Sequence, residues 1–128
     1  MKPEELLYTN DHEWLEKDSS KPVCVGITEY AANELGDIVY VELPEVGDEF
    51  EQHEAFGNVE SVKAVSPLNM PVAGKIVEVN ENLEDSPELV NQSPMTEGWM
   101  VKVEVSDNVQ LEGLMNHSAY QELLKKQG

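Results

Sequence analysis

Short apolar runs of β-branched residues, most with a period of two, constrain the fold of this chain more than any other feature. The clearest run alternates Trp99, Val101, Val103 and Val105 with Met100, Lys102 and Glu104. A period of two places alternate side chains on opposite faces of a strand, whereas an amphipathic helix needs a period near 3.6. Glycine, proline, asparagine or aspartate bounds these runs, as is typical of turns. The pattern therefore predicts a mainly β fold, arranged as a small barrel or sandwich.

The same pattern gives approximate positions for the strands. We expect strands at residues 14–17, 23–27, 37–43, 56–63, 73–80 and 99–105. Polar residues and a proline at 18–22 predict a hairpin loop between the first two strands. A chain of 128 residues, of which 40% are hydrophobic, suits one domain over residues 1–128.

Two short helices are expected between the strands. Thr28 is a suitable N-cap and Gly36 a suitable C-terminal stop, so residues 28–36 should form a helix. Ser86 followed by Pro87 predicts a single helical turn at 86–90, since proline is favoured at the first helical position.

A further helix is expected at the C-terminal end, at residues 118–126. Ser118 to Gln121 resembles a capping box. Tyr120, Leu123 and Leu124 would then share one face, through which the helix packs on the sheet.

Net charge excludes several classes of partner. The chain has 26 acidic and 8 basic residues, all of the basic ones lysines, and a formal net charge of −18. Nucleic acids and anionic membrane surfaces need clustered basic residues, so neither is expected as a partner. The sequence contains no run of 18 apolar residues and no secretory signal pattern. We therefore expect a cytoplasmic protein, or a mitochondrial matrix protein if this is a processed eukaryotic form.

The sequence shows no catalytic or metal-binding pattern. Cys24 is the single cysteine and lies in an apolar run, which is typical of a buried small hydrophobic residue. His12, His53 and His117 are scattered without ligand spacing. No phosphate-binding loop, nucleophile elbow or His-Glu metal motif is present. We therefore expect no catalytic residues, no metal and no enzymatic activity.

Lys63 is the most unusual local feature, since it stands alone between two short apolar segments in Val59–Pro67. Two strands meeting there would place it on an exposed hairpin turn, where another enzyme can reach it. Pro71 and Gly74 bracket residues 75–80, which we expect to be the return strand. An exposed lysine at a turn is by itself ordinarily only solubilising.

The segment around this lysine, Glu60-Ser61-Val62-Lys63-Ala64, resembles the lipoyl-attachment site of the glycine cleavage system H protein family. The resemblance extends over about Tyr8 to Leu124 through several motifs in the expected order. These motifs are His12-Glu13-Trp14, Gly26-Ile27-Thr28, Leu35 to Pro44, Asn80 to Leu83, Pro87 to Asn91 and Gly98-Trp99.

This resemblance implies a lipoyl-domain-like barrel-sandwich hybrid that carries lipoate in amide linkage on Lys63. The attachment motif would comprise Lys63 with its neighbours Glu60, Ser61, Val62 and Ala64. The chain would be a monomeric, non-catalytic carrier modified by a lipoate-attaching enzyme. It would take the aminomethyl group of glycine from the pyridoxal-phosphate glycine decarboxylase to the tetrahydrofolate-dependent aminomethyltransferase. Dihydrolipoyl dehydrogenase would then reoxidise it.

Two carboxylates are candidates for contacts in this cycle. Glu13 would contact the loaded amine in a groove that shields it, or it is simply a solvated carboxylate beside a core Trp14. Glu60 would be recognised by the lipoate-attaching enzyme, or it is a solvated strand residue. The negative net charge would steer the carrier toward basic rims on its partners.

Three other readings remain beside this one. A biotin carrier is disfavoured because Val62 and Ala64, and not methionines, flank Lys63. An H-like protein that relays lipoate to 2-oxoacid dehydrogenases is barely separable by sequence. An unmodified acidic interaction module predicts no mass added at Lys63.

Overall fold

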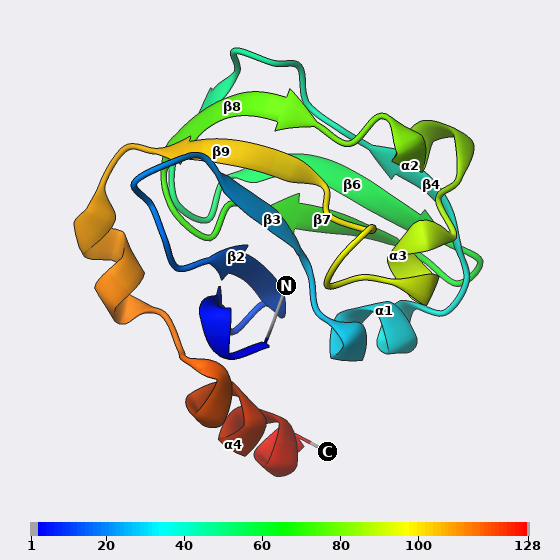
Figure 1. Ribbon diagram of the computed structural model, residues 1–128. Coiled ribbons are helices and arrows are strands. Elements are labelled where there is room, and N and C mark those ends of the chain that lie inside the picture. The colour runs from blue at the N-terminus through cyan, green and yellow to red at the C-terminus, as the bar shows by residue number, and fades with distance from the viewer. Residues whose placement is uncertain (1–2, 128) are drawn as a thin grey trace.

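The computed structural model describes residues 3–127, which form two antiparallel sheets with short helices at their ends (Figure 1). Sheet A contains, in spatial order, β1 (Leu6–Tyr8), β2 (Glu13–Glu16), β3 (Val23–Ile27), β9 (Val101–Val105), β8 (Gly74–Val79) and β5 (Glu49–Phe50). Sheet B contains β4 (Ile38–Glu42), β6 (Ala55–Ser61) and β7 (Val65–Asn69). The predicted mainly β class, with short helices and a C-terminal helix, is confirmed, although the strands of residues 3–127 form two sheets and not one closed barrel.

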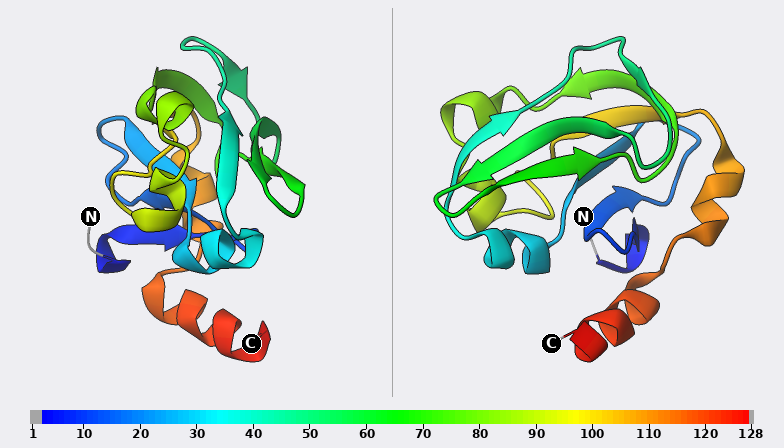
Figure 2. Two further views of the ribbon diagram at one scale, coloured as in Figure 1. Left: turned by 90° about the vertical axis from the view of Figure 1, so that its right-hand side faces the viewer. Right: turned by 180° about the vertical axis from the view of Figure 1, so that it is seen from behind.

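The helices lie around the ends of the two sheets. They are η1 (Pro3–Glu5), α1 (Glu29–Leu35), α2 (Asn82–Asp85), α3 (Leu89–Gln92), η2 (Asn108–Gly113) and α4 (His117–Gln127). Figure 2 shows α1 beside the tip of the β6–β7 hairpin, whereas α4 extends below the sheets. Within the described part of the chain, no helix is long and apolar enough to cross a membrane.

The main core fills the space between the two sheets. Sheet A contributes fully buried valines such as Val25 and Val103, and sheet B contributes Val41 and Val59. Burial of this apolar surface is the main contribution that holds the two layers together. A second cluster of Tyr8, Trp14, Cys24 and Tyr120 with Leu6 lies on the other side of sheet A, under α4.

The expected return strand of the lysine hairpin was wrong. β6 pairs with β7, at residues 65–69, whereas the expected segment 75–80 largely forms β8 of sheet A. β7 contains Pro67, which cannot donate a ladder hydrogen bond and so weakens the sequence signal of a strand. Proline is tolerated here because β7 is the edge strand of sheet B.

Met100 departs from the alternation expected over residues 99–105. The alternation groups it with Lys102 and Glu104, but its side chain is fully buried. Met100 precedes β9, and its N–H donates to the Val25 carbonyl 2.8 Å away. The alternation of buried and exposed side chains holds only within the paired strand, and Met100 lies just before it.

The first expected helix is confirmed and the second is displaced. In α1 the Thr28 hydroxyl accepts the Ala31 N–H at 3.3 Å, and Gly36 ends the helix with φ of +78°. Ser86, expected to begin a helix, instead ends α2, because its N–H donates to the Asn82 carbonyl. The next helix, α3, therefore begins only at Leu89.

The C-terminal helix forms where expected but has a different cap. The Asn116 side-chain oxygen accepts the Ala119 N–H at 2.9 Å, so Asn116 caps α4 in place of Ser118. Tyr120 is buried, and Leu123 and Leu124 pack beside it, as predicted.

Candidate functional site

The tip of the β6–β7 hairpin is closed by one serine. The Ser61 hydroxyl oxygen accepts the N–H groups of Lys63 at 3.2 Å and Ala64 at 3.1 Å. The Ser61 N–H donates to the Ala64 carbonyl at 2.8 Å, and its hydroxyl lies 3.2 Å from the same oxygen. Serine side chains stabilise turns in this way because they bond to nearby backbone groups. The backbone of Lys63 is thus fixed while its side chain is exposed.

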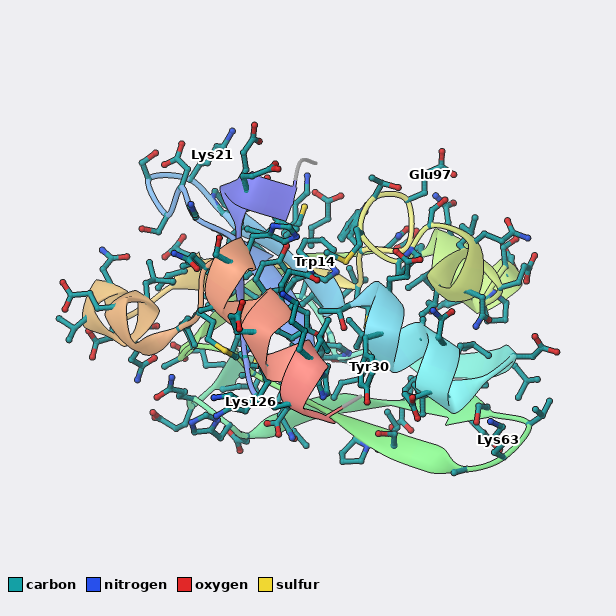
Figure 3. All side chains as sticks on the ribbon, turned by 90° about the horizontal axis from the view of Figure 1, so that it is seen from below. Trp14, Lys21, Tyr30, Lys63, Glu97 and Lys126 are labelled. Carbon is teal, nitrogen blue, oxygen red and sulfur yellow. The ribbon has the colours of Figure 1, made fainter. Side chains whose placement is uncertain are left out.

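A second contact anchors this turn to the end of α1. The Val62 N–H donates to the Asp37 carbonyl at 3.0 Å. The Lys63 side chain crosses the adjacent Gly36, where an added Cβ would lie 3.4 Å from Lys63 Cε. Figure 3 shows Lys63 at the hairpin tip, beside this end of α1. Glycine is therefore favoured at position 36 by its positive φ, and the lysine side chain lies in van der Waals range of it.

Asn91 of α3 holds the segment beneath the lysine. Its side-chain N–H donates to the Gly36 carbonyl at 2.8 Å, and its oxygen accepts the Ile38 N–H at 2.8 Å. One side chain thus bonds the backbone on both sides of Asp37, whose carbonyl bonds the hairpin tip. The lysine position depends on α3 as well as on the hairpin.

The outer face of sheet B beside Lys63 is exposed and partly apolar. Glu60 lies opposite Tyr40 on one side and Val65 on the other, and all three side chains are exposed. Val62 at the tip is 67% exposed. An enzyme that modifies Lys63 would therefore meet apolar side chains and the Glu60 carboxylate on this face of the sheet.

A cavity of about 340 Å³ lies between α1 and the β6–β7 hairpin, and we call it the α1 cleft. Its walls include Tyr30, Ala31, Glu34 and Leu35 of α1 and Val59, Ser66, Pro67 and Leu68 of the hairpin, and Asp11 to Glu13 and Ile27 complete it. Leu35 precedes Gly36 in the chain, and Ser66 is three residues beyond Lys63. The cleft therefore begins next to the place where the lysine side chain lies.

Glu13 lines the α1 cleft and is 3% exposed. Its two oxygens accept the Thr9 hydroxyl at 3.1 Å and the Asn69 N–H at 3.2 Å. Burial raises the pKa of Glu13 to about 8, with a smaller contribution in the same direction from the Asp11 carboxylate. The alternative of a solvated carboxylate is therefore wrong, whereas the expected burial of Trp14 is confirmed.

The structure brings some predicted residues together and separates others. Glu60, Ser61, Val62, Lys63 and Ala64 share the hairpin tip, as their adjacency requires. Glu13 lies apart from them, along the α1 cleft. Neither Asn91 nor Tyr30 was predicted as a site residue, although Asn91 ends one of the motifs. Both act through contacts with segments distant in sequence, which a local pattern does not show.

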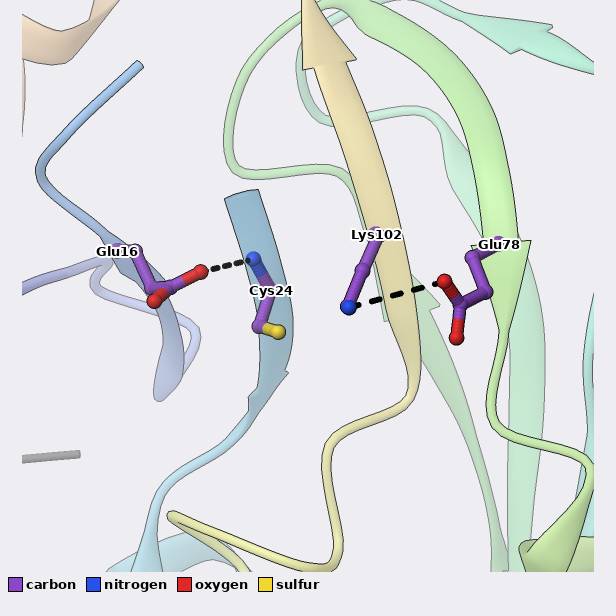
Figure 4. A network of polar contacts seen from close by, with 4 residues as sticks. All are labelled: Glu16, Cys24, Glu78 and Lys102. Carbon is purple, nitrogen blue, oxygen red and sulfur yellow. Dashed lines mark hydrogen bonds and ion pairs between the residues drawn. The ribbon is translucent and has the colours of Figure 1, made fainter. Parts of the chain in front are cut away.

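Cys24 is an unsuitable nucleophile. Burial raises the pKa of its thiol to about 12, and the nearby Glu16 carboxylate adds to the effect. Figure 4 shows the Cys24 N–H donating to Glu16 Oε1 at 2.8 Å, with an ion pair of 3.6 Å between Lys102 and Glu78 on the neighbouring strands. Among residues 3–127, no group of three or more His, Cys, Asp or Glu side chains is placed to hold a metal ion.

Comparisons with known proteins agree with this geometry. The family model described as glycine cleavage H-protein matches residues 6–127. The glycine cleavage system H protein of Staphylococcus epidermidis is 57% identical over 122 residues, covering 95% of this chain and 96% of the relative. That of Bacillus licheniformis is 55% identical over 124 residues, covering 97% of each. The crystal structure of a Mycobacterium marinum glycine cleavage system H protein is 38% identical, with a TM-score of 0.89 over 97% of this chain and 99% of that one.

Proposed function

The chain belongs to the glycine cleavage H-protein family, the lipoyl carriers of the glycine cleavage system, and on that premise we propose that lipoate is attached to Lys63. The observation that carries the proposal is the position of Lys63, exposed on a fixed turn, over Gly36 and beside the α1 cleft. A rigid attachment point with an exposed side-chain amine suits acylation by another enzyme.

The surrounding residues fit such a group. Gly36 leaves room for the lysine stem, and the α1 cleft offers a cavity of about 340 Å³ next to it. The hairpin wall contributes apolar Val59, Pro67 and Leu68. When bound, lipoate supplies a cyclic disulfide on a flexible arm.

We propose that the chain receives the aminomethyl group of glycine from the pyridoxal-phosphate glycine decarboxylase and delivers it to the tetrahydrofolate-dependent aminomethyltransferase. Dihydrolipoyl dehydrogenase then reoxidises the carrier. In this role the chain is a monomeric, non-catalytic component in the cytoplasm. A mobile group on one fixed lysine can visit several enzymes at high effective concentration.

In the proposed cycle, Glu13 holds the loaded amine inside the α1 cleft. A cation against a buried carboxylate favours the ionised form, so a docked ammonium would lower the raised pKa of Glu13. The cleft would also exclude water, which protects a group prone to hydrolysis. Docking of the loaded amine would release the proton that Glu13 holds at neutral pH.

Glu60 is proposed as the contact for the lipoate-attaching enzyme. It is exposed, three residues before Lys63, and flanked by Tyr40 and Val65 on the same face. A carboxylate among apolar side chains suits a partner with a basic group beside an apolar patch. The net charge of −18 would speed such encounters at low ionic strength.

Intact mass tests the attachment directly. The protein would be incubated with lipoate, ATP and a lipoate ligase and compared with Lys63→Arg, which keeps the positive charge. We expect the mass of one lipoyl group on a peptide that contains Lys63, and none in the variant. No added mass, in a protein that remains folded, would contradict the proposal and favour an unmodified interaction module.

The modified protein then distinguishes glycine cleavage from a relay of lipoate to 2-oxoacid dehydrogenases. Glycine-dependent exchange of carbon dioxide with a glycine decarboxylase should require lipoylated wild-type protein. A carrier that lacks this exchange but transfers lipoate to an acyltransferase domain would support the relay.

A further inference from the structure

A second cavity lies on the other side of Tyr30. It has a volume of about 360 Å³ and is lined by residues of α1 and α4, among them Tyr30, Tyr120 and Thr28. Tyr30 lines both this cavity and the α1 cleft. The C-terminal helix therefore reaches the residues that form the α1 cleft, although it lies far from Lys63 in sequence and in Figure 3.

Tyr120 of α4 makes two short hydrogen bonds at this junction. Its hydroxyl lies 2.7 Å from the Thr28 hydroxyl and 2.8 Å from Nδ1 of His12. Thr28 already accepts the Ala31 N–H, so its own proton is available for Tyr120. Tyr120 can then donate to His12, which places the ring proton of neutral His12 on Nε2.

His12 is held in a backbone conformation that L residues rarely adopt. Its φ is +66°, in the left-handed region. Its ring packs on Tyr30, with 4.6 Å between centroids, and its carbonyl accepts the Thr28 N–H at 2.9 Å. A strained residue of this kind persists only where its surroundings determine it. The Tyr120 hydroxyl is one of those determinants.

The conformation of His12 decides where Glu13 points. Glu13 follows His12 directly, and its N–H and one carboxylate oxygen both bond the Thr9 hydroxyl. The same short turn therefore orients Glu13 into the α1 cleft while the His12 ring contacts Tyr30. A change in the conformation of His12 would therefore move both Glu13 and Tyr30, which line the cleft from different elements.

We propose that Tyr120 is a positioning residue for the α1 cleft, acting through His12 and Thr28 to hold Glu13 and Tyr30 in place. This inference rests on the proposed function for its consequence, since the cleft matters only if it holds the loaded arm. The hydroxyl contributes geometry and touches no reacting atom.

The test compares Tyr120→Phe, which keeps the ring and its stack on Tyr8, with Leu124→Ala, which weakens α4 packing and leaves the hydroxyl. Both variants would be lipoylated and loaded with glycine and a glycine decarboxylase. The lifetime of the added aminomethyl mass would then be followed by intact mass. Loss of the hydroxyl, with its hydrogen bonds to Thr28 and His12, should shorten this lifetime about threefold to tenfold in Tyr120→Phe. Leu124→Ala should change the lifetime little, even if it lowers the melting temperature as much as Tyr120→Phe does.

A spectroscopic readout separates this proposal from the attachment itself. In unmodified protein, side-chain ¹⁵N shifts should show the Nε2–H tautomer of His12 in wild type and a mixture in Tyr120→Phe. The Glu13 carboxyl titration should move toward its ordinary value in that variant. An unchanged tautomer and titration, or equal lifetimes in both variants, would overturn the proposal. Failure of lipoylation alone would contradict only the proposed function, since these shifts need no lipoate.

Discussion

The Lys63 end and the Glu13 end of the α1 cleft are built in opposite ways. Lys63 is exposed on a turn fixed by backbone hydrogen bonds and one hydroxyl. Glu13 is almost completely buried, beside Trp14 and within a network of side chains. One end suits access by large partners and the other suits exclusion of water. Substitutions near Lys63 should therefore change modification with little loss of stability, whereas those near Glu13 should change stability itself.

Replacing Trp14 with alanine should have the largest effect on stability. The indole is fully buried, and its N–H lies 2.8 Å from the Ile27 carbonyl and 3.1 Å from that of Pro94. We expect a loss of about 4 kcal/mol in the free energy of unfolding, measured by urea denaturation. Val62→Ala at the exposed tip is the control and should change it by less than about 0.5 kcal/mol. Comparable losses at the two positions would break the contrast between the ends.

Glu13 should make stability fall as the pH rises. Its pKa is about 8 in the folded protein, against an ordinary value of 4.5 for a glutamate carboxyl. Between these two pH values the folded state keeps a proton that the unfolded state releases. The free energy of unfolding therefore decreases as the pH rises through this window. We expect a contribution of roughly 1 kcal/mol lost per pH unit across this window, and none further above it.

The variant Glu13→Gln isolates that contribution. Denaturant unfolding at several pH values should show a flatter profile for this variant than for wild type between pH 5 and about 8. Glu60→Gln, at an exposed position, should leave the profile unchanged. A slope that persists in Glu13→Gln would assign it to another group and would contradict the buried, protonated Glu13.

Asn91→Ala should affect the Lys63 end by an intermediate amount. It removes two hydrogen bonds of 2.8 Å, to the Gly36 carbonyl and the Ile38 N–H. We expect a loss of about 2 kcal/mol in unfolding free energy, together with slower lipoylation of Lys63. The neighbouring Gln92→Ala is the matched control, since Gln92 is exposed. Lipoylation at the wild-type rate would show that the turn holds its position without α3.

Ser61→Ala should have the smallest effect of the four. The hydroxyl holds the Lys63 and Ala64 N–H groups at a partly exposed turn, so its loss should cost about 1 kcal/mol. Amide hydrogen exchange at these two residues should become faster, while exchange at Val59 in the strand stays slow. Uniformly faster exchange along β6 would mean that Ser61 stabilises the whole hairpin and not its tip alone.

The exposed turn was predictable because its signals are local. The five residues that resemble an attachment motif are consecutive, and a lysine between two strand-like runs indicates a hairpin tip. The same holds for α1, where Thr28 and Gly36 mark both ends. Trp14 was expected in the core and is fully buried.

The buried end was less predictable because its contacts join distant segments. Glu13 is bonded by Asn69, 56 residues away, and lies between elements whose packing no local pattern shows. The return strand was missed because Pro67 is compatible with a strand only at a sheet edge, and edge position is a property of the assembled sheet. Ser86 was misplaced because a helical turn already forms at Asn82–Asp85, so that Ser86 ends this turn and does not begin the next.

The two ends of α1 set a fixed distance in this molecule. Gly36 at its C-terminal end underlies the lysine stem, and Thr28 at its N-terminal end bonds Tyr120. A helix of seven residues spans about 10 Å, so the length of α1 sets the separation between Lys63 and the inner part of the cleft. The length of a lipoyl arm is set by chemistry and not by the gene. If the arm is held in the α1 cleft as proposed, an insertion of one turn in α1 would mismatch arm and cleft even in a normally folded protein.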